Sequence, residues 1–110
     1  VLPAVLGVLG PNGQLVCLIK PQFEAGREKV GKKGVVRDIN VHREVIEMIV
    51  NYVRAQNLGI LALDFSPIKG PEGNIEYLIF LSKDNEKQLL VDNVKIDEIA
   101  EKSHTELSGE

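Results

Sequence analysis

Basic side chains gather in one short segment of this sequence, where they could bind phosphate groups. Residues 20–43 hold seven basic and three acidic residues, whereas the whole 110-residue chain has a net charge of −3. In open α/β sheets, ligands bind beside the loops that leave the carboxyl ends of strands, and this segment follows a strand-like run. The candidate phosphate-binding residues are Arg27, Lys29, Lys32, Lys33 and Arg37. The same charges could instead belong to a solvated loop without a ligand.

Two further charged residues border apolar runs. Lys20 ends the run 15–19 and precedes a proline, and Glu76 opens the run 77–81. A lysine in this position is most simply an exposed residue at a strand boundary, because the following proline cannot donate to a sheet. A glutamate at the start of an apolar strand indicates either the end of a sheet or a carboxylate with a bonding partner. The pattern alone leaves both interpretations open.

Other motifs of known chemistry are absent from the sequence. It contains no Gly-x-Ser-x-Gly turn, no Gly-x-x-x-x-Gly-Lys-Ser/Thr loop and no Gly-x-Gly-x-x-Gly. His42 and His104 do not have metal-ligand spacing with Cys17, so no zinc site is predicted. We interpret the single cysteine as a core residue, since it cannot form an internal disulfide.

The composition is that of one globular domain, with 44% hydrophobic and 26% charged residues. The first 19 residues carry no charge. Proline and glycine interrupt them and no basic segment precedes them, so neither a membrane helix nor a secretory signal is predicted. The sequence begins with Val1 rather than Met, and we expect it to be a piece of a longer protein.

The elements that must position the charged residues follow from hydrophobic spacing. Val5, Leu6 and Leu9 keep helical spacing, which predicts a short helix before a turn at 10–13. The unbroken apolar run 15–19 predicts a strand with both faces covered. A long loop rich in glycine and charge follows that strand.

A helix is predicted from Asn40 to Leu58–Gly59, with Asp38 or Asn40 as its N-cap. Its apolar stripe comprises Val41, Val45, Ile49, Tyr52 and Val53. Strands are predicted over 60–65 and 75–81, as an antiparallel hairpin around a connection of nine residues.

The segment 84–110 is acidic, with a net charge of −5. Asp92 is expected to cap a final helix, and the last few residues are expected to fray. The predicted buried face of that helix comprises Ile96, Ile99, Ala100 and Ser103.

Five segments together resemble a known family: Gly10–Val16, Leu18–Arg27, Gly34–Asp38, Ser66–Ile68 and Gly70–Glu76. The combination is similar to the hemolysin A (TlyA) family of ribosomal RNA methyltransferases, a branch of the FtsJ-like 2′-O-methyltransferases. The likeness runs from residue 1 to about Ser82.

The resemblance implies an α/β fold, the C-terminal part of a Rossmann-like S-adenosylmethionine methyltransferase with a three-stranded mixed sheet and helices. Residues 1–83 would be the C-terminal half of the methyltransferase domain, and 84–110 an acidic helix and tail. We expect residues 75–82 to lie between 14–20 and 60–65, antiparallel to both. The strand 14–20 would then lack its other neighbour, and its open edge favours a homodimer.

The resemblance also implies function: Lys20 and Glu76 match the second lysine and the glutamate of a lysine–aspartate–lysine–glutamate catalytic set. The other two residues and the glycine-rich cofactor loop would precede Val1, so cofactor-binding residues stay unknown. A carboxylate raises the pKa of a lysine, so Glu76 is an orienting group rather than the source of activation. The implied cofactor is S-adenosylmethionine, the substrate ribosomal RNA and the location the cytoplasm. Alternatives are a non-catalytic RNA-binding scaffold or a hemolysin-like membrane-active protein.

Overall fold

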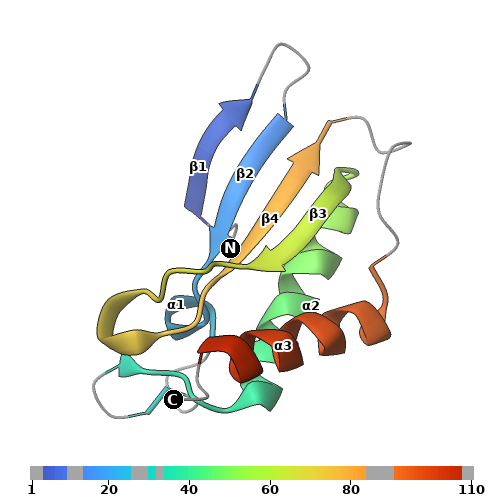
Figure 1. The fold of residues 1–110 in the computed structure, drawn as a ribbon. Coiled ribbons are helices and arrows are strands. Elements are labelled where there is room, and N and C mark those ends of the chain that lie inside the picture. The colour runs from blue at the N-terminus through green and yellow to red at the C-terminus, as the bar shows by residue number, and fades with distance from the viewer. Residues whose placement is uncertain (1–3, 10–13, 26–29, 32–33, 84–90, 108–110) are drawn as a thin grey trace.

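The computed structural model describes residues 4–9, 14–25, 30–31, 34–83 and 91–107 of the chain (Figure 1). In chain order, the helices and strands are β1 (Ala4–Leu9), β2 (Gln14–Ile19), α1 (Pro21–Glu24), α2 (Ile39–Ala55), β3 (Gly59–Phe65), β4 (Tyr77–Ser82) and α3 (Asn93–Leu107). The strands of this described part form one sheet in the order β1-β2-β4-β3. Helices α2 and α3 pack against each other and against β3.

The sheet confirms the predicted α/β class and the predicted order of its last three strands. Strand β4 lies between β2 and β3 and is antiparallel to both, with Tyr77 opposite Ile19 on one side and opposite Phe65 on the other. The hairpin predicted from β3 into β4 is present, although Ile75 and Glu76 precede the strand rather than open it. Central placement pairs β4 at both edges, but Leu78 and Phe80 are only half-buried. Along β2 only Cys17 and Ile19 are buried, so the prediction that both faces of this strand are covered is wrong: the helices cover one face of the sheet.

The first predicted element is wrong. Residues 4–9 form strand β1, antiparallel to β2 with Val5 opposite Cys17, and not a helix. A short apolar run suits either structure, and here pairing satisfies the backbone groups along the edge of β2. The described sheet therefore has four strands rather than three, and its neighbouring pairs are antiparallel rather than mixed. Residues 14–20 are not an open edge, so the predicted homodimer loses that support and stays a prediction.

Helix α2 begins as the sequence predicts and ends slightly earlier. The Asp38 carboxylate accepts a hydrogen bond of 2.8 Å from the Asn40 backbone N–H, which satisfies one unpaired donor of the first turn. The helix stops at Ala55, and Asn57 (φ 59°) takes the left-handed position that we expected near Gly59. Asparagine tolerates this conformation better than most residues.

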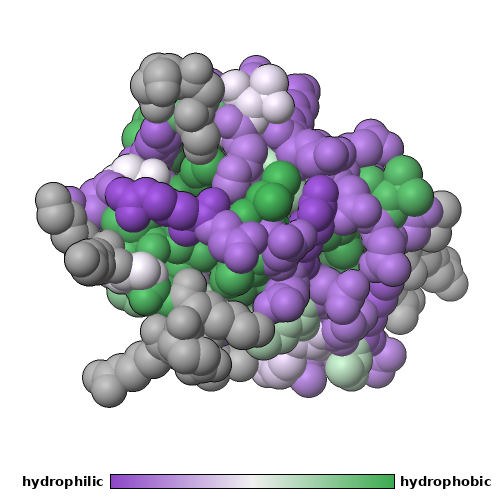
Figure 2. Space-filling view, turned by 90° about the horizontal axis from the view of Figure 1, so that it is seen from below, coloured by the Kyte–Doolittle hydropathy of each residue, from purple (hydrophilic) through white to green (hydrophobic). Residues whose placement is uncertain are grey.

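The core lies between the sheet and the two long helices. Of the predicted apolar stripe of α2, only Tyr52 is half-buried rather than buried. The buried face of this helix also includes three residues outside the stripe, and it comprises Val41, His42, Val45, Ile46, Ile49, Val50 and Val53. Helix α3 buries the face predicted for it, namely Ile96, Ile99, Ala100 and Ser103. Each large apolar side chain removed from water stabilises the fold by about 1.5–3 kcal/mol. Seen from below, hydrophilic residues separate the apolar areas of the described surface (Figure 2).

Helix α3 also begins at the predicted cap. The Asp92 carboxylate accepts a hydrogen bond of 2.9 Å from the Lys95 backbone N–H. Because Ile96 and Ile99 belong to the same core cluster as α2 and the sheet, α3 packs onto the fold that residues 14–82 build. The fraying expected for the last residues concerns 108–110, which lie outside the described residues.

Two segments that border the sheet end are joined through Asn74. Its side-chain oxygen accepts a hydrogen bond of 3.0 Å from the Val36 backbone N–H, and its amide nitrogen donates to the Gly34 carbonyl at 2.9 Å. Asn74 is 1% exposed, and its bond with Val36 forms away from water, where hydrogen bonds are strongest. The link fixes residues 34–36 against the connection between β3 and β4.

Candidate active site

The structure places the two predicted catalytic residues at the same end of the sheet. Lys20 directly follows β2, and Glu76 directly precedes β4. Since Ile19 pairs with Tyr77 in an antiparallel ladder, the next position along each strand brings the backbones of Lys20 and Glu76 opposite one another. The carboxyl end of a strand in an α/β sheet is the usual place for a ligand site. Their catalytic roles stay predictions.

Helix α1 begins immediately after Lys20 and carries Gln22, whose side chain contacts Glu76 at this end of the sheet. Pro21 stands at the first helical position, where its missing N–H costs nothing, and Lys20 is the N-cap. The backbone N–H groups of Phe23 and Glu24 both donate to the Lys20 carbonyl, at 2.9 and 3.0 Å. This short turn replaces part of the structureless loop that the sequence predicts over residues 21–39.

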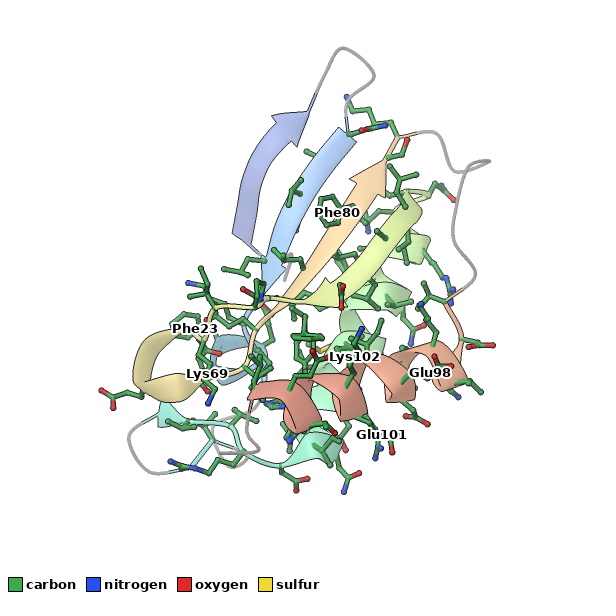
Figure 3. All side chains as sticks on the ribbon, in the orientation of Figure 1. Phe23, Lys69, Phe80, Glu98, Glu101 and Lys102 are labelled. Carbon is green, nitrogen blue, oxygen red and sulfur yellow. The ribbon has the colours of Figure 1, made fainter. Side chains whose placement is uncertain are left out.

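The Lys20 ammonium lies over an aromatic ring. Its Nζ is 5.5 Å from the centroid of the Phe23 ring, within range of a cation–π attraction. Lys20 is half-buried, whereas Phe23 is 71% exposed. Phe23 and Lys69 both lie at the α1 end of the molecule, while Phe80 lies on the middle of the sheet (Figure 3). The lysine is thus held near the surface at the sheet end.

Glu76 is buried and has a specific partner. The residue is 5% exposed, and its Oε2 accepts a hydrogen bond of 2.8 Å from Gln22 Nε2. A buried carboxylate needs such bonds because it has lost its hydration. Both interpretations left open by the sequence hold: Glu76 lies at the end of the sheet, and its carboxylate has a bonding partner.

Gly70 leaves room for that carboxylate. A Cβ built on Gly70 would lie 2.1 Å from Glu76 Oε2 and 2.4 Å from its Cδ, far inside any real contact. The carboxylate therefore rests against the bare backbone of the connection between β3 and β4. The sequence marks Gly70 only as a turn residue, and its absent side chain matters for a different reason.

A second buried polar group, missed by the sequence analysis, lies below the sheet end. His42 is fully buried; its Nε2 donates to the Val36 carbonyl at 3.0 Å, and its Nδ1 lies 2.7 Å from Nε2 of His104. A carbonyl only accepts, so the proton of neutral His42 is on Nε2 and its Nδ1 is the acceptor. His104 must then donate from its own Nε2. The pair joins α2 to α3.

This geometry keeps His42 neutral. Burial, followed by the neighbouring His104, lowers the pKa of His42 to about 4. Burial and the nearby Arg43 also lower the pKa of His104, against a smaller raising effect of Asp38. A protonated His42 would carry a second N–H at Nδ1, so His104 would have to shift its own proton from Nε2 to Nδ1 to keep the hydrogen bond.

Of the predicted phosphate-binding residues, Arg37 is described and exposed. It lines a cavity of about 380 Å³ together with Lys69, Glu72, His104 and apolar residues of the two segments that Asn74 joins. Arg27, Lys29, Lys32 and Lys33 lie outside the described residues. Cys17 is 1% exposed, as expected of a core residue, and burial raises the pKa of its thiol.

Metal-binding clusters and membrane-spanning helices are both missing from the described residues. Within those ranges, no group of three or more His, Cys, Asp or Glu side chains could hold a metal ion. No helix in the part of the chain that the structure describes is both long and apolar enough to cross a membrane.

Comparison with known proteins identifies the family. Residues 4–83 match the model of the FtsJ-like methyltransferase family. The chain belongs to this family. The match covers β1 to β4 and includes both Lys20 and Glu76.

Individual relatives agree with this assignment. The chain is 46% identical over 88 residues to "Putative rRNA methyltransferase YqxC" of Bacillus subtilis, covering 80% of the chain and 31% of that protein. It is 37% identical over 91 residues to "16S/23S rRNA (cytidine-2'-O)-methyltransferase TlyA" of Mycobacterium tuberculosis, covering 81% and 33%. A solved structure titled "Putative hemolysin from Streptococcus thermophilus" is 40% identical with a TM-score of 0.80, covering 92% of this chain and 36% of the other. The chain therefore spans about a third of the length of these relatives.

Proposed function

We propose that this chain carries part of the active site of an S-adenosylmethionine-dependent ribosomal RNA 2′-O-methyltransferase. The observation that carries the proposal is that the backbones of Lys20 and Glu76 lie opposite one another at the carboxyl end of β2, within a family of methyltransferases. Two relatives with this activity or name share more than a third of their aligned residues with the chain.

The proposed roles follow from the surroundings of the two residues. Bound S-adenosylmethionine would supply an electrophilic methyl group on a sulfonium. Lys20, half-buried at the sheet end, would hydrogen-bond the ribose 2′-hydroxyl and, as the neutral amine, take up its proton as the oxygen attacks. Glu76, held in place by Gln22, would orient Lys20 and the ribose. Both residues would therefore act on the attacking ribose hydroxyl rather than on the cofactor. The sequence contains no glycine-rich fingerprint for binding the cofactor.

The remaining parts of the proposal concern partners and organisation. We assign Arg37 and the basic residues before it to contacts with RNA phosphates, since the described Arg37 is exposed at the same end of the fold. We place the enzyme in the cytoplasm, where ribosomal RNA is found. We also propose that residues 1–83 are the C-terminal half of the methyltransferase domain and that 84–110 are an acidic helix and tail, of which α3 docks onto α2 and β3.

The test is methyl transfer by the full-length protein that carries this chain. Wild type should transfer a radiolabelled methyl group from S-adenosylmethionine to ribosomal RNA. Lys20→Ala should reduce turnover by about 10²–10⁴-fold, the usual contribution of a proton-transferring side chain, and change RNA affinity by less than about threefold. Lys102→Ala, at an exposed lysine of α3, is the matched control and should retain wild-type turnover.

Two results would contradict the proposal. Wild-type turnover in Lys20→Ala would remove the lysine from the reaction. A wild-type protein that binds ribosomal RNA but transfers no methyl group would instead be an RNA-binding scaffold.

A further inference from the structure

Gln22 makes its hydrogen bond to Glu76 across 54 residues of sequence, from α1 to the segment before β4. It lies two residues after Lys20, so one short turn of helix carries both the predicted lysine and the group that holds the predicted carboxylate. The bond is 2.8 Å long and joins the amide donor of Gln22 to a carboxyl oxygen of Glu76.

The other end of the Gln22 amide is unsatisfied. Its Oε1 is buried and has no hydrogen-bond partner among the described residues. Turning the amide around would put two oxygens against each other, so the contact with Glu76 fixes its orientation. A side chain kept for stability alone would gain from satisfying both ends of the amide. In Gln22 the Oε1 acceptor has no partner, while the Nε2 donor is bonded to the Glu76 carboxylate.

Gly70 confines the carboxylate from the opposite direction. Any side chain there would overlap Glu76, because even a Cβ would come within 2.1 Å of Oε2. Glu76 is 5% exposed, so a displaced carboxylate has little free space to enter. The donor of Gln22 and the bare backbone of Gly70 together define one position for this group.

We propose that Gln22 is a positioning residue of the methyltransferase site, which fixes the Glu76 carboxylate relative to Lys20, and that Gly70 is the counterpart that makes this position accessible. The inference rests on the proposed function. It assigns no contact with substrate to Gln22, which acts through Glu76.

The decisive variant is Gln22→Glu, assayed for methyl transfer in the full-length protein from pH 6 to 9. The introduced carboxyl group would repel Glu76 when it is ionised, whereas in its protonated form it would donate an O–H to Glu76 and restore the bond. Two carboxyl groups at this distance share a proton and one of their pKa values rises. The ratio of variant to wild-type kcat should therefore increase by about tenfold or more as the pH falls across this range.

Two further variants keep the inference testable if that one folds poorly. Gln22→Leu removes the donor at every pH, so its kcat should fall by about 10–100-fold, with a ratio to wild type that does not change with pH and with KM for RNA nearly constant. Gly70→Ala displaces the carboxylate without touching Gln22 and should give a similar loss of kcat. Gln56→Glu, the same substitution at an exposed glutamine after α2, is the control and should retain wild-type kcat at all pH values.

Glu76→Gln separates the two proposals. If Glu76→Gln is inactive while Gln22→Leu and Gly70→Ala have wild-type kcat, the positioning role is wrong and the proposed function stands. If Glu76→Gln itself has wild-type kcat, the role of the carboxylate in the proposed function is wrong. A Gln22→Glu ratio that is flat with pH would also overturn the inference, since a purely structural role predicts no recovery in acid.

Discussion

Acidification to pH 4 should destabilise this fold through His42. The imidazole is fully buried, its Nε2 donates to the Val36 carbonyl and its Nδ1 accepts from His104. Protonation would place a charge where water cannot hydrate it, beside His104, and would force His104 to change its tautomer. The charged groups that bear on the pair are Arg43, which opposes protonation of His104, and Asp38, which favours it weakly.

The size of the effect follows from the pKa of His42. Its pKa is about 4 in the folded chain and 6.5 when unperturbed. The folded pKa is the lower one, so below pH 6.5 the unfolded chain takes up a proton that the folded chain refuses. Stability is fully present above pH 6.5 and is lost as the pH falls towards 4. At 1.36 kcal/mol per pKa unit the loss amounts to about 3 kcal/mol, a large part of the stability of a small domain.

The assay is urea denaturation of the 110-residue chain, followed by circular dichroism between pH 7.5 and 4. Many surface carboxylates also titrate below pH 5, so His42→Gln provides the comparison. The free energy of unfolding of wild type should fall by about 2–4 kcal/mol more than that of the variant over this range. Parallel curves for the two proteins would refute the reasoning, because they would mean that His42 accepts its proton without cost.

Three further outcomes follow from the structure. Burial raises the pKa of Tyr77 to about 12, and its hydroxyl bonds a serine of α3 at 2.9 Å, so Tyr77→Phe should lower the free energy of unfolding by about 1 kcal/mol in denaturation. Charge reversal of Arg37, Lys32 and Lys33 in the full-length protein should weaken RNA binding and flatten its salt dependence, and an unchanged salt slope would show that the segment is merely solvated. Calorimetry should find no micromolar binding of S-adenosylmethionine to the 110-residue chain, because it lacks the glycine-rich turn that supplies most of the affinity for such cofactors.

The sequence predicts those parts of the fold that depend on local patterns. The run before Lys20 is uniformly apolar and forms the predicted strand, although only one of its faces is buried, and the stripes of α2 and α3 have clear helical spacing. The short run at Val5 satisfies both periods, and only pairing with β2 decides that it is a strand. Local reasoning also misplaced the end of α2, because asparagine and glycine can both take the left-handed position there.

The site is less predictable, because its decisive contacts join distant residues. Lys20 and Glu76 are identified through a family motif, but nothing near either residue indicates that Gln22 holds the carboxylate across 54 positions. The contact between His42 and His104 spans 62 positions and has no motif. Gly70 looks like an ordinary turn residue until the carboxylate beside it is located.

The central place of β4 determines when the lysine and the carboxylate can meet during folding. The hairpin from β3 into β4 closes over a short connection, but β2 must wait for a strand whose pairing residue Tyr77 lies far along the chain from Ile19. Closing so long a loop carries an entropic cost that must be met before the contacts form, which makes such pairings late and slow events. During synthesis, Lys20 leaves the ribosome well before Glu76 exists. Residues 20 and 76 therefore face one another only after the sheet has closed, and under the proposed roles a nascent or partly folded molecule would lack the site.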